Sequence, residues 1–311
     1  MTSAARKFRD GFKSWLHTVF AAGQKLGWDI LPRHFYSSIP DIAELRREDA
    51  WKKPASMFGV NGADVSCQMQ FVRECCPPPL RERVRQGGIH AHACQENGEP
   101  GYGPVEADFL FCFIATKRPG RILQVGCGVS TAVILLAAKE AGYQPRITCI
   151  EPFPTAYLRR LAEQEVIELI PAKAQHADLG IFSRLDRGDL LFIDSTHAVR
   201  PGSEVNRLIL EVLPRLNPGC FVHFHDIYFP YDYQSTVLTT LFFGGESTLL
   251  HAFLIGNARY SIAACLSMLH HACRQEMQAV FPNYQPAPMH YGLHLESGGG
   301  HFPSSIYLAV H

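Results

Sequence analysis

The feature that most constrains the fold of this chain is a regular alternation of short apolar runs with helical patterns between residues 105 and 225. The apolar runs lie at 121–125, 146–150, 166–170, 189–193 and 219–225, and the helical patterns lie at 105–116, 130–142, 155–165 and 202–216. Short apolar strands that alternate with helices predict a parallel sheet with helices on both faces, which is a doubly wound α/β domain. Such domains bind ligands beyond the carboxyl ends of their strands.

A glycine loop directly follows the first predicted strand. Gly126 and Gly128 stand between this strand and the next helix, where glycine lets the backbone turn tightly and approach a ligand. The third glycine of the dinucleotide fingerprint is replaced by Thr131, which disfavours pyrophosphate binding and a nicotinamide-dependent oxidoreductase. Glu151, at the end of the second predicted strand, can accept both ribose hydroxyls of an adenosine. The pattern therefore favours an adenosine-containing ligand that lacks a pyrophosphate.

Polar side chains gather where the fourth and fifth predicted strands end. Asp194 and His197 follow the fourth strand, and His225 and Asp226 end the fifth. Because parallel strands open on the same edge of a sheet, these four side chains could converge. They could hold a divalent metal, with imidazole shifting the preference from magnesium toward manganese, iron, cobalt or zinc. Alternatively, His197 or His225 could accept a proton without any metal.

The segment 1–104 lacks the alternation and is predicted to be an irregular, partly helical N-terminal extension that covers the ligand crevice as a lid. The predicted α/β domain is 105–311, with further helices at 247–256 and 271–280, a strand or helix at 260–269, and a final strand near the end. The first 28 residues are basic and amphipathic. We expect them to form a helix that packs on the domain or on a second subunit as a homodimer. A transit peptide or a membrane-surface helix is the other interpretation.

The composition excludes several classes of protein. A formal net charge of +0 and a pI of about 7.2 argue against a nucleic-acid-binding protein, which needs a clustered basic surface. Ten cysteines without a CxxC pair indicate a reducing compartment and no zinc ribbon, so we expect a cytoplasmic protein. No apolar stretch reaches the length of a transmembrane helix.

Several stretches together resemble the class I S-adenosylmethionine-dependent methyltransferases, most closely the small-molecule branch known as methyltransferase domain type 24. The resemblance covers roughly residues 26–265. Its motifs are "RILQVGCGVSTAVILLA", "ITCIEPFP", "GDLLFIDSTH", "NRLILEVLPRLNPGCFVHFHDIYFPYDY" and "LLHAFLIGNARY". It implies a mostly parallel, seven-stranded, Rossmann-like sheet and S-adenosylmethionine as the methyl donor.

The resemblance also implies which residues bind the donor. The glycine loop would line its methionine part, Glu151 its ribose and Gln175 its adenine, while Asp194 would face the sulfonium and the acceptor. The expected cofactor-binding residues are Gly126, Cys127, Gly128, Ser130, Thr131, Glu151, Gln175 and Asp194.

Metal-dependent O-methyltransferases of this class place acidic or amide ligands after the fourth and fifth strands. The chain departs from them by having His225 in the first position of the second pair. We predict methyl transfer to a small-molecule or peptide acceptor, such as a secondary metabolite, at oxygen. Catalysis would rest on Asp194, His197 and His225, and the expected metal ligands are Asp194, His197, His225 and Asp226. The alternatives are an N-methyltransferase that uses histidine as proton acceptor without metal, and a non-catalytic S-adenosylmethionine-binding protein.

Overall fold

A computed structural model describes the backbone of residues 3–295 and 298–311, and the side chains from residue 12 onward within these ranges. Contacts divide the chain into two compact units, one up to Glu48 and one from Asp49 to His311. Across the described ranges, no helix is both long enough and apolar enough to cross a membrane.

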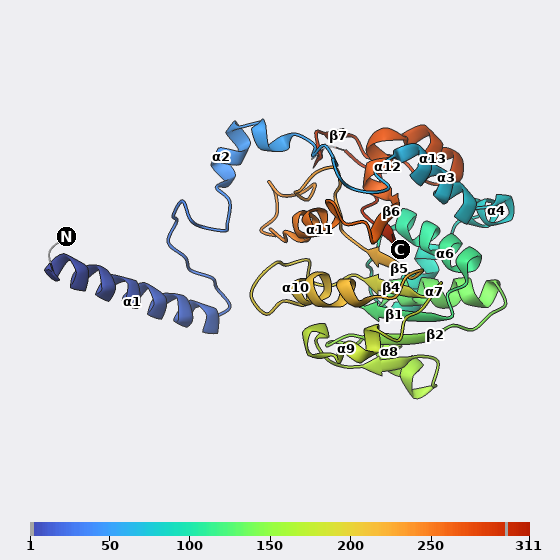
Figure 1. Ribbon diagram of the computed structural model, residues 1–311, viewed down its shortest axis with the longest axis horizontal. Coiled ribbons are helices and arrows are strands. Elements are labelled where there is room, and N and C mark those ends of the chain that lie inside the picture. Colours follow the sequence, from blue (N-terminus) through green and yellow to red (C-terminus); the bar gives the residue numbers. More distant parts are fainter. Residues whose placement is uncertain (1–2, 296–297) are drawn as a thin grey trace. The chain divides into compact units, whose positions relative to one another are not determined.

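The second unit is built on a seven-stranded sheet with the order β3-β2-β1-β4-β5-β9-β6 (Figure 1). Strands β1 to β5 are parallel, and β9 runs antiparallel between β5 and β6. The strands are β1 (Arg121–Val125), β2 (Arg146–Ile150), β3 (Glu168–Ile170), β4 (Leu190–Ile193), β5 (Phe221–Phe224), β6 (Tyr260–Cys265) and β9 (Ile306–Val310). A separate hairpin pairs β7 (Met289–His290) with β8 (Leu293–His294). The predicted doubly wound, mostly parallel sheet is confirmed.

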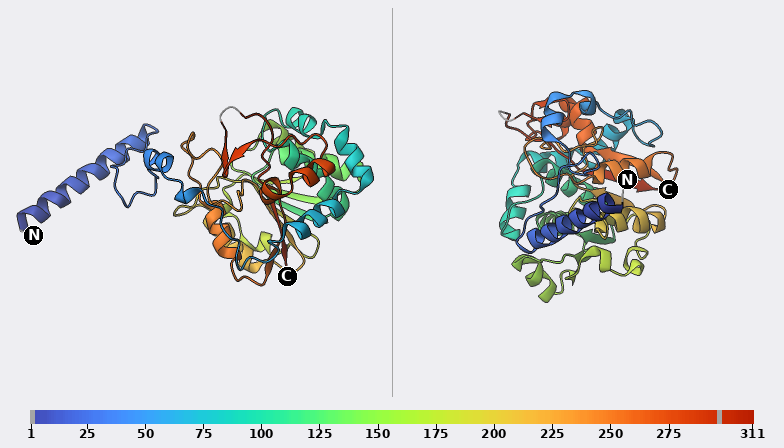
Figure 2. Two further views of the ribbon diagram at one scale, coloured as in Figure 1. Left: turned by 90° about the horizontal axis from the view of Figure 1, so that it is seen from above. Right: turned by 90° about the vertical axis from the view of Figure 1, so that its left-hand side faces the viewer.

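Helices lie on both sides of this sheet (Figure 2). Successive residues of a strand point to opposite faces, so Leu190 and Phe192 of β4 enter one apolar core while Leu191 and Ile193 enter the other. The first core contains residues of α3 (Val65–Cys75), α4 (Pro78–Arg85), α5 (Ile89–Asn97), α6 (Pro104–Lys117), α7 (Val129–Glu140), α8 (Ala156–Glu163), α12 (Leu266–Ala272) and α13 (Arg274–Val280). The second contains residues of α9 (Leu179–Phe182), α10 (Glu204–Arg207), a π-helical turn η3 (Leu208–Val212) and α11 (Glu246–Leu254). Burial on both faces explains why the strands are mainly apolar.

The structure corrects several local predictions. For the helix after the glycine loop, the pattern at 130–142 suggests Ser130 as the N-cap. The helix instead begins at Val129, and its N-cap is Gly128. The ambiguous segment 260–269 contains both possibilities, because β6 ends at Cys265 and α12 follows at once. Helices α3, α4 and α5 fall in a region that we expected to be irregular.

The first unit contains α1 (Ser3–Lys25) and α2 (Ile42–Arg47), and α1 is a single uninterrupted helix (Figure 2). The predicted N-terminal helix is therefore present from Ser3, while residues 1 and 2 lie outside the described residues. Helix α2 begins after Asp41, whose carboxylate accepts hydrogen bonds from the N–H groups of Ala43 and Glu44.

Asp108 is a carboxyl group buried within α6. Burial raises its pKa to about 7, although the cation of Arg83 opposes the shift. The unfolded chain therefore releases this proton at a lower pH than the folded chain, and the free energy of unfolding falls as pH rises from about 4 to 7. We expect Asp108→Asn to raise the free energy of unfolding by about 2 kcal/mol at neutral pH and by much less at pH 4. Urea unfolding at several pH values measures the difference; an equal difference at every pH would contradict it.

Candidate active site

A cavity of about 390 Å³ lies at the carboxyl ends of β1, β2 and β4. Four of the predicted cofactor-binding residues line it: Gly126, Glu151, Gln175 and Asp194. They come from the loops after three different strands and from the short 3₁₀ turn η2 (Ala174–His176). Ligands of doubly wound sheets bind at this edge, so the cavity has the position expected for the methyl donor.

Gly126 makes the close approach of two of these loops possible. Its φ is +80°, a conformation that residues with a side chain rarely adopt. A Cβ added there would lie 1.6 Å from the carbonyl oxygen of Asp194. A residue with a side chain at position 126 would therefore push apart the loops that form the cavity.

Glu151 connects the glycine loop to the turn that follows β2. Its carboxylate accepts hydrogen bonds from the N–H of Phe153, at 2.9 Å, and from the N–H of Cys127, at 3.4 Å. The loop amides therefore hold this carboxylate at the wall of the cavity.

The remaining predicted cofactor residues are not among those that line the cavity in the described part of the chain. Ser130 and Thr131 are buried in the first turn of α7, where their hydroxyls hydrogen-bond to the side chain of Gln124. Thr131 also accepts a hydrogen bond from the N–H of Gly128 and so caps the helix. These two residues shape the loop from behind, and a direct role for them, Cys127 and Gly128 in cofactor binding stays a prediction.

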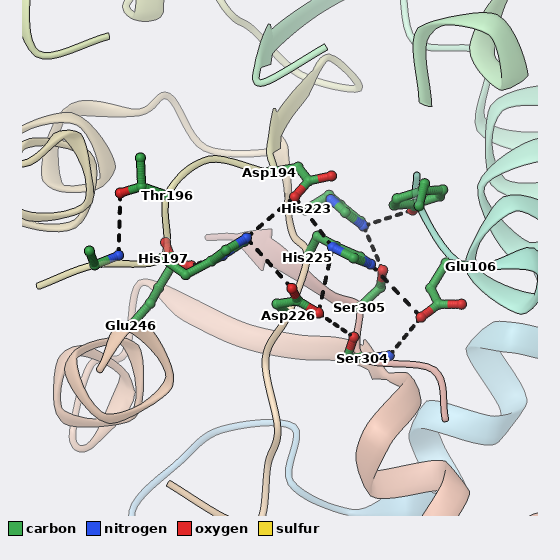
Figure 3. Close-up of polar contacts among 12 residues, drawn as sticks. Glu106, Asp194, Thr196, His197, His223, His225, Asp226, Glu246, Ser304 and Ser305 are labelled. Atoms are coloured by element: carbon green, nitrogen blue, oxygen red, sulfur yellow. Dashed lines mark hydrogen bonds and ion pairs between the residues drawn. The ribbon is translucent and has the colours of Figure 1, made fainter. Parts of the chain in front are cut away.

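The predicted cluster at the ends of β4 and β5 does converge (Figure 3). Nε2 of His197 lies 3.5 Å from Oδ1 of Asp194, and Nδ1 of His225 lies 3.3 Å from the same oxygen. Asp226 contacts both imidazoles, with Oδ2 at 3.6 Å from His197 and Oδ1 at 3.7 Å from His225. One ligand atom each from Asp194, His197 and His225 lies within 4.8 Å of the others.

The parallel ladder continues one residue past these strands and sets this geometry. The N–H of Asp194 donates to the carbonyl of Val125 at 2.8 Å, and the N–H of His225 donates to that of Ile193 at 2.9 Å. Asp194 and His225 are thereby held side by side. His197 and Asp226 instead have positive φ angles of 57° and 54°. Such conformations are uncommon for residues with a side chain and often occur at functional sites.

Two buried glutamates, which the sequence analysis missed, support the histidines from outside the cluster. Oε2 of Glu246 lies 2.7 Å from Nδ1 of His197, and Oε1 of Glu106 lies 3.9 Å from Nε2 of His225. Ser304 connects Asp226 to Glu106. Its hydroxyl donates a hydrogen bond to Asp226 at 2.8 Å, and its N–H donates one to Glu106 at 2.9 Å. One signal was available: Glu106 and Asp108 are acidic residues within an otherwise apolar helix, and buried carboxylates require partners. Nothing in the sequence pairs Glu246 with His197.

The charges of the cluster are strongly coupled. Burial disfavours the imidazolium form of His197, but the carboxylates of Asp194, Glu246 and Asp226 outweigh this effect and raise its pKa to about 11. Burial also opposes ionisation of His225, and Asp194 and Asp226 raise its pKa to about 9. Burial alone would raise the pKa of Asp194, but the two histidines lower it well below its usual range. The carboxylates therefore create a strong preference for positive charge at the centre of the cluster.

His223 lies two residues deeper in β5 and is fully buried. Its Nε2 lies 3.1 Å from the hydroxyl of Tyr102 and 3.0 Å from that of Ser305. Burial lowers its pKa well below the usual value, so it is neutral. His223 is therefore a hydrogen-bonded residue of the core.

A seven-stranded sheet in this order, with a glycine loop after β1 and an acidic residue after β2, defines the Rossmann-like fold of class I S-adenosylmethionine-dependent methyltransferases. A family model described as "Methyltransferase domain" matches residues 123–227. An uncharacterized protein of Archaeoglobus fulgidus is 31% identical over 168 residues, which cover 50% of this chain and 73% of that protein.

Several of the solved structures with similarity to the chain are methyltransferases. An SAH-bound methyltransferase of Podospora anserina is 15% identical with a TM-score of 0.40, covering 91% of this chain and 99% of its own. A putative caffeoyl-CoA O-methyltransferase of Staphylococcus aureus is 15% identical with a TM-score of 0.40, covering 57% of this chain and 87% of its own.

The chain belongs to the class I methyltransferase family, in the branch known as methyltransferase domain type 24. It is an S-adenosylmethionine-dependent methyltransferase. The predictions of family, fold and methyl donor are confirmed.

Proposed function

We propose that this enzyme transfers the methyl group to an oxygen of a small-molecule or peptide acceptor that binds a divalent metal ion held by Asp194, His197, His225 and Asp226. The observation that carries the proposal is the convergence of one oxygen and two imidazole nitrogens within 4.8 Å at the edge of the donor cavity. Asp194 belongs to both the cavity lining and this cluster, so donor and acceptor would meet at its carboxylate.

The orientation of the two histidines supports a metal site. Each imidazole directs one nitrogen toward Asp194 and Asp226 and the other toward a buried glutamate. Ligating histidines in proteins commonly donate their other N–H to a carboxylate, which fixes the tautomer and the ring orientation. His197 has this arrangement with Glu246 at hydrogen-bonding distance, whereas Glu106 is farther from His225.

The electrostatics of the cluster also support the proposal. Three carboxylates surround His197 and three surround His225. Without a metal, the raised pKa values of both histidines keep them protonated at neutral pH, and a protonated imidazole cannot accept a proton from the acceptor. This observation disfavours the metal-free histidine base. The mixed nitrogen and oxygen donors favour manganese, iron, cobalt or zinc over magnesium.

The residues of the chain mainly position the donor and the acceptor. A bound divalent cation would lower the pKa of an acceptor hydroxyl that coordinates it. Glu151 and Asp194, which both line the cavity, would contact the ribose and the sulfonium of the donor. The reacting oxygen has to lie in line with the bond from sulfur to methyl. The buried Glu246 would hold the imidazole of His197 in place while the acceptor binds, and the buried Glu106 lies 3.9 Å from that of His225.

Removal of metal tests the proposal. We expect the enzyme to lose at least about 90% of its methyl-transfer activity after chelation and dialysis. The assay uses labelled S-adenosylmethionine, with extracts and model hydroxyl compounds as acceptors. Activity should return with Mn²⁺, Fe²⁺ or Co²⁺ more readily than with Mg²⁺. Calorimetry with S-adenosylmethionine on the same sample shows whether the donor site is intact. An unchanged rate after chelation would reject the metal and leave histidine-assisted transfer to oxygen or nitrogen.

The contact of Glu246 with His197 gives a second expectation for the same site. Glu246→Ala removes the carboxylate that holds Nδ1 of His197, so the affinity for Mn²⁺ should fall by about 10–100-fold. Glu246→Gln retains a hydrogen-bond acceptor and should lose less. Titration of the apoenzyme with Mn²⁺ measures both variants, and Glu276→Gln, on α13, is the matched control. Equal affinities in all three variants would contradict the role of Glu246.

A further inference from the structure

We propose that α1 is a membrane-surface helix that binds lipid bilayers with anionic headgroups. The inference concerns the first unit alone and is independent of the acceptor and of the metal.

The charge of α1 differs from that of the rest of the chain. Its sequence, SAARKFRDGFKSWLHTVFAAGQK, contains five lysine and arginine residues and one acidic residue. The whole chain has 29 basic and 29 acidic residues, so the excess of four positive charges in α1 is balanced by an excess of four negative charges elsewhere. A basic helix of this kind is attracted to anionic lipid headgroups, and each lysine or arginine near the surface adds to the attraction.

The apolar residues of α1 supply the second part of the argument. Phe12, Trp15, Leu16, Val19 and Phe20 have the spacing of a single helix face. The rings of Phe12 and Trp15 stack with their centroids 5.9 Å apart, and their exposed fractions are 53% and 58%. Large aromatic side chains on one face and basic residues on the other are typical of helices that lie in the membrane interface.

The connection between α1 and α2 extends this aromatic character. Trp28, Phe35 and Tyr36 are 71%, 82% and 81% exposed. Tryptophan and tyrosine are enriched at membrane interfaces, because their rings are apolar and their N–H and O–H groups remain hydrated. A nucleic acid would use the basic residues but would leave the leucine, valine and phenylalanine face in water. The combination therefore favours a lipid surface.

Co-sedimentation of the full chain with vesicles tests the proposal. We expect binding to vesicles of phosphatidylcholine and phosphatidylglycerol at least about tenfold stronger than to phosphatidylcholine alone, with a decrease at high salt. Phe12→Ala with Trp15→Ala should weaken binding about tenfold or more. Arg6→Gln, Lys7→Gln and Arg9→Gln together should remove the preference for the anionic lipid. The matched control is Phe58→Ala, which removes an aromatic ring that is 86% exposed in the second unit.

Two results would overturn the inference. One is equal binding of the wild type and the Phe12/Trp15 variant to anionic vesicles. The other is that the wild type does not bind the vesicles but forms a dimer in sedimentation experiments, and that the Phe12/Trp15 variant abolishes this dimer. That result would assign this helix face to a second copy of the chain. Circular dichroism of each variant would show that its helix content is retained.

Discussion

Replacing Asp194 by asparagine is expected to lower kcat/KM for methyl transfer by about 10³-fold. This carboxylate lines the donor cavity and faces both histidines, at 3.5 Å from His197 and 3.3 Å from His225. Asparagine keeps the size of the side chain but loses the charge that His197 and His225 stabilise. Steady-state kinetics with labelled donor, together with Mn²⁺ titration of the apoenzyme, measure the effect on chemistry and on metal binding.

Asp232→Asn provides the control for this substitution. Asp232 is an exposed carboxylate six residues after Asp226, and its replacement should leave both measurements unchanged. Retention of at least half of the wild-type rate by Asp194→Asn would contradict the assignment of this cluster as the active site.

Gly126→Ala is expected to abolish donor binding or to prevent folding. The new Cβ would overlap the carbonyl oxygen of Asp194, at 1.6 Å, and the backbone would also keep a φ of +80°. The backbone of one loop fixes the position of this Cβ, and the atom it meets is a backbone oxygen of the other loop, so no side-chain rotation relieves the clash. We expect the affinity for S-adenosylmethionine, measured by calorimetry, to fall at least about 100-fold, or the free energy of unfolding to fall by several kcal/mol, about 3 or more.

Gly188→Ala separates the clash from the backbone strain. Gly188 has a similar φ of +85°, but a Cβ there would meet nothing within 4 Å. Its replacement should cost only the conformational penalty, about 1–2 kcal/mol, with donor affinity unchanged. If the two variants bind S-adenosylmethionine equally well, the close approach of the loops after β1 and β4 is not required for donor binding.

The sequence was sufficient to predict a parallel sheet, and the strand order expected for this fold then predicted the convergence at its edge. Each of the first five strands is a short apolar run, and parallel pairing aligns their ends. Any polar residue one position past a strand therefore lies beside its counterpart on the neighbouring strand, as Asp194 and His225 do. His197 and Asp226 complete the cluster through positive φ angles that the local sequence does not reveal.

The supporting residues could not be predicted in the same way. Glu246 and Glu106 reach the histidines from α11 and α6, which are far from them in sequence, and only tertiary packing brings them together. Helices α3, α4 and α5 were missed because proline and glycine punctuate that region and suggested loops. The N-cap of α7 was misplaced because Ser130 is a common capping residue, whereas the backbone of Gly128 takes that position with help from Thr131.

The insertion of β9 between β5 and β6 has a consequence for the order in which the enzyme can assemble. Ser304 and Ser305 directly precede β9 and bond to Asp226 and His223, so a stretch near residue 311 braces a strand formed by residues 221–224. During translation, all four predicted ligands leave the ribosome well before this stretch does. Until it arrives, β5 is an edge strand, and Asp226 and His223 lack their serine partners. Completion of the cluster therefore depends on a strand that lies far beyond its four predicted ligands in the sequence.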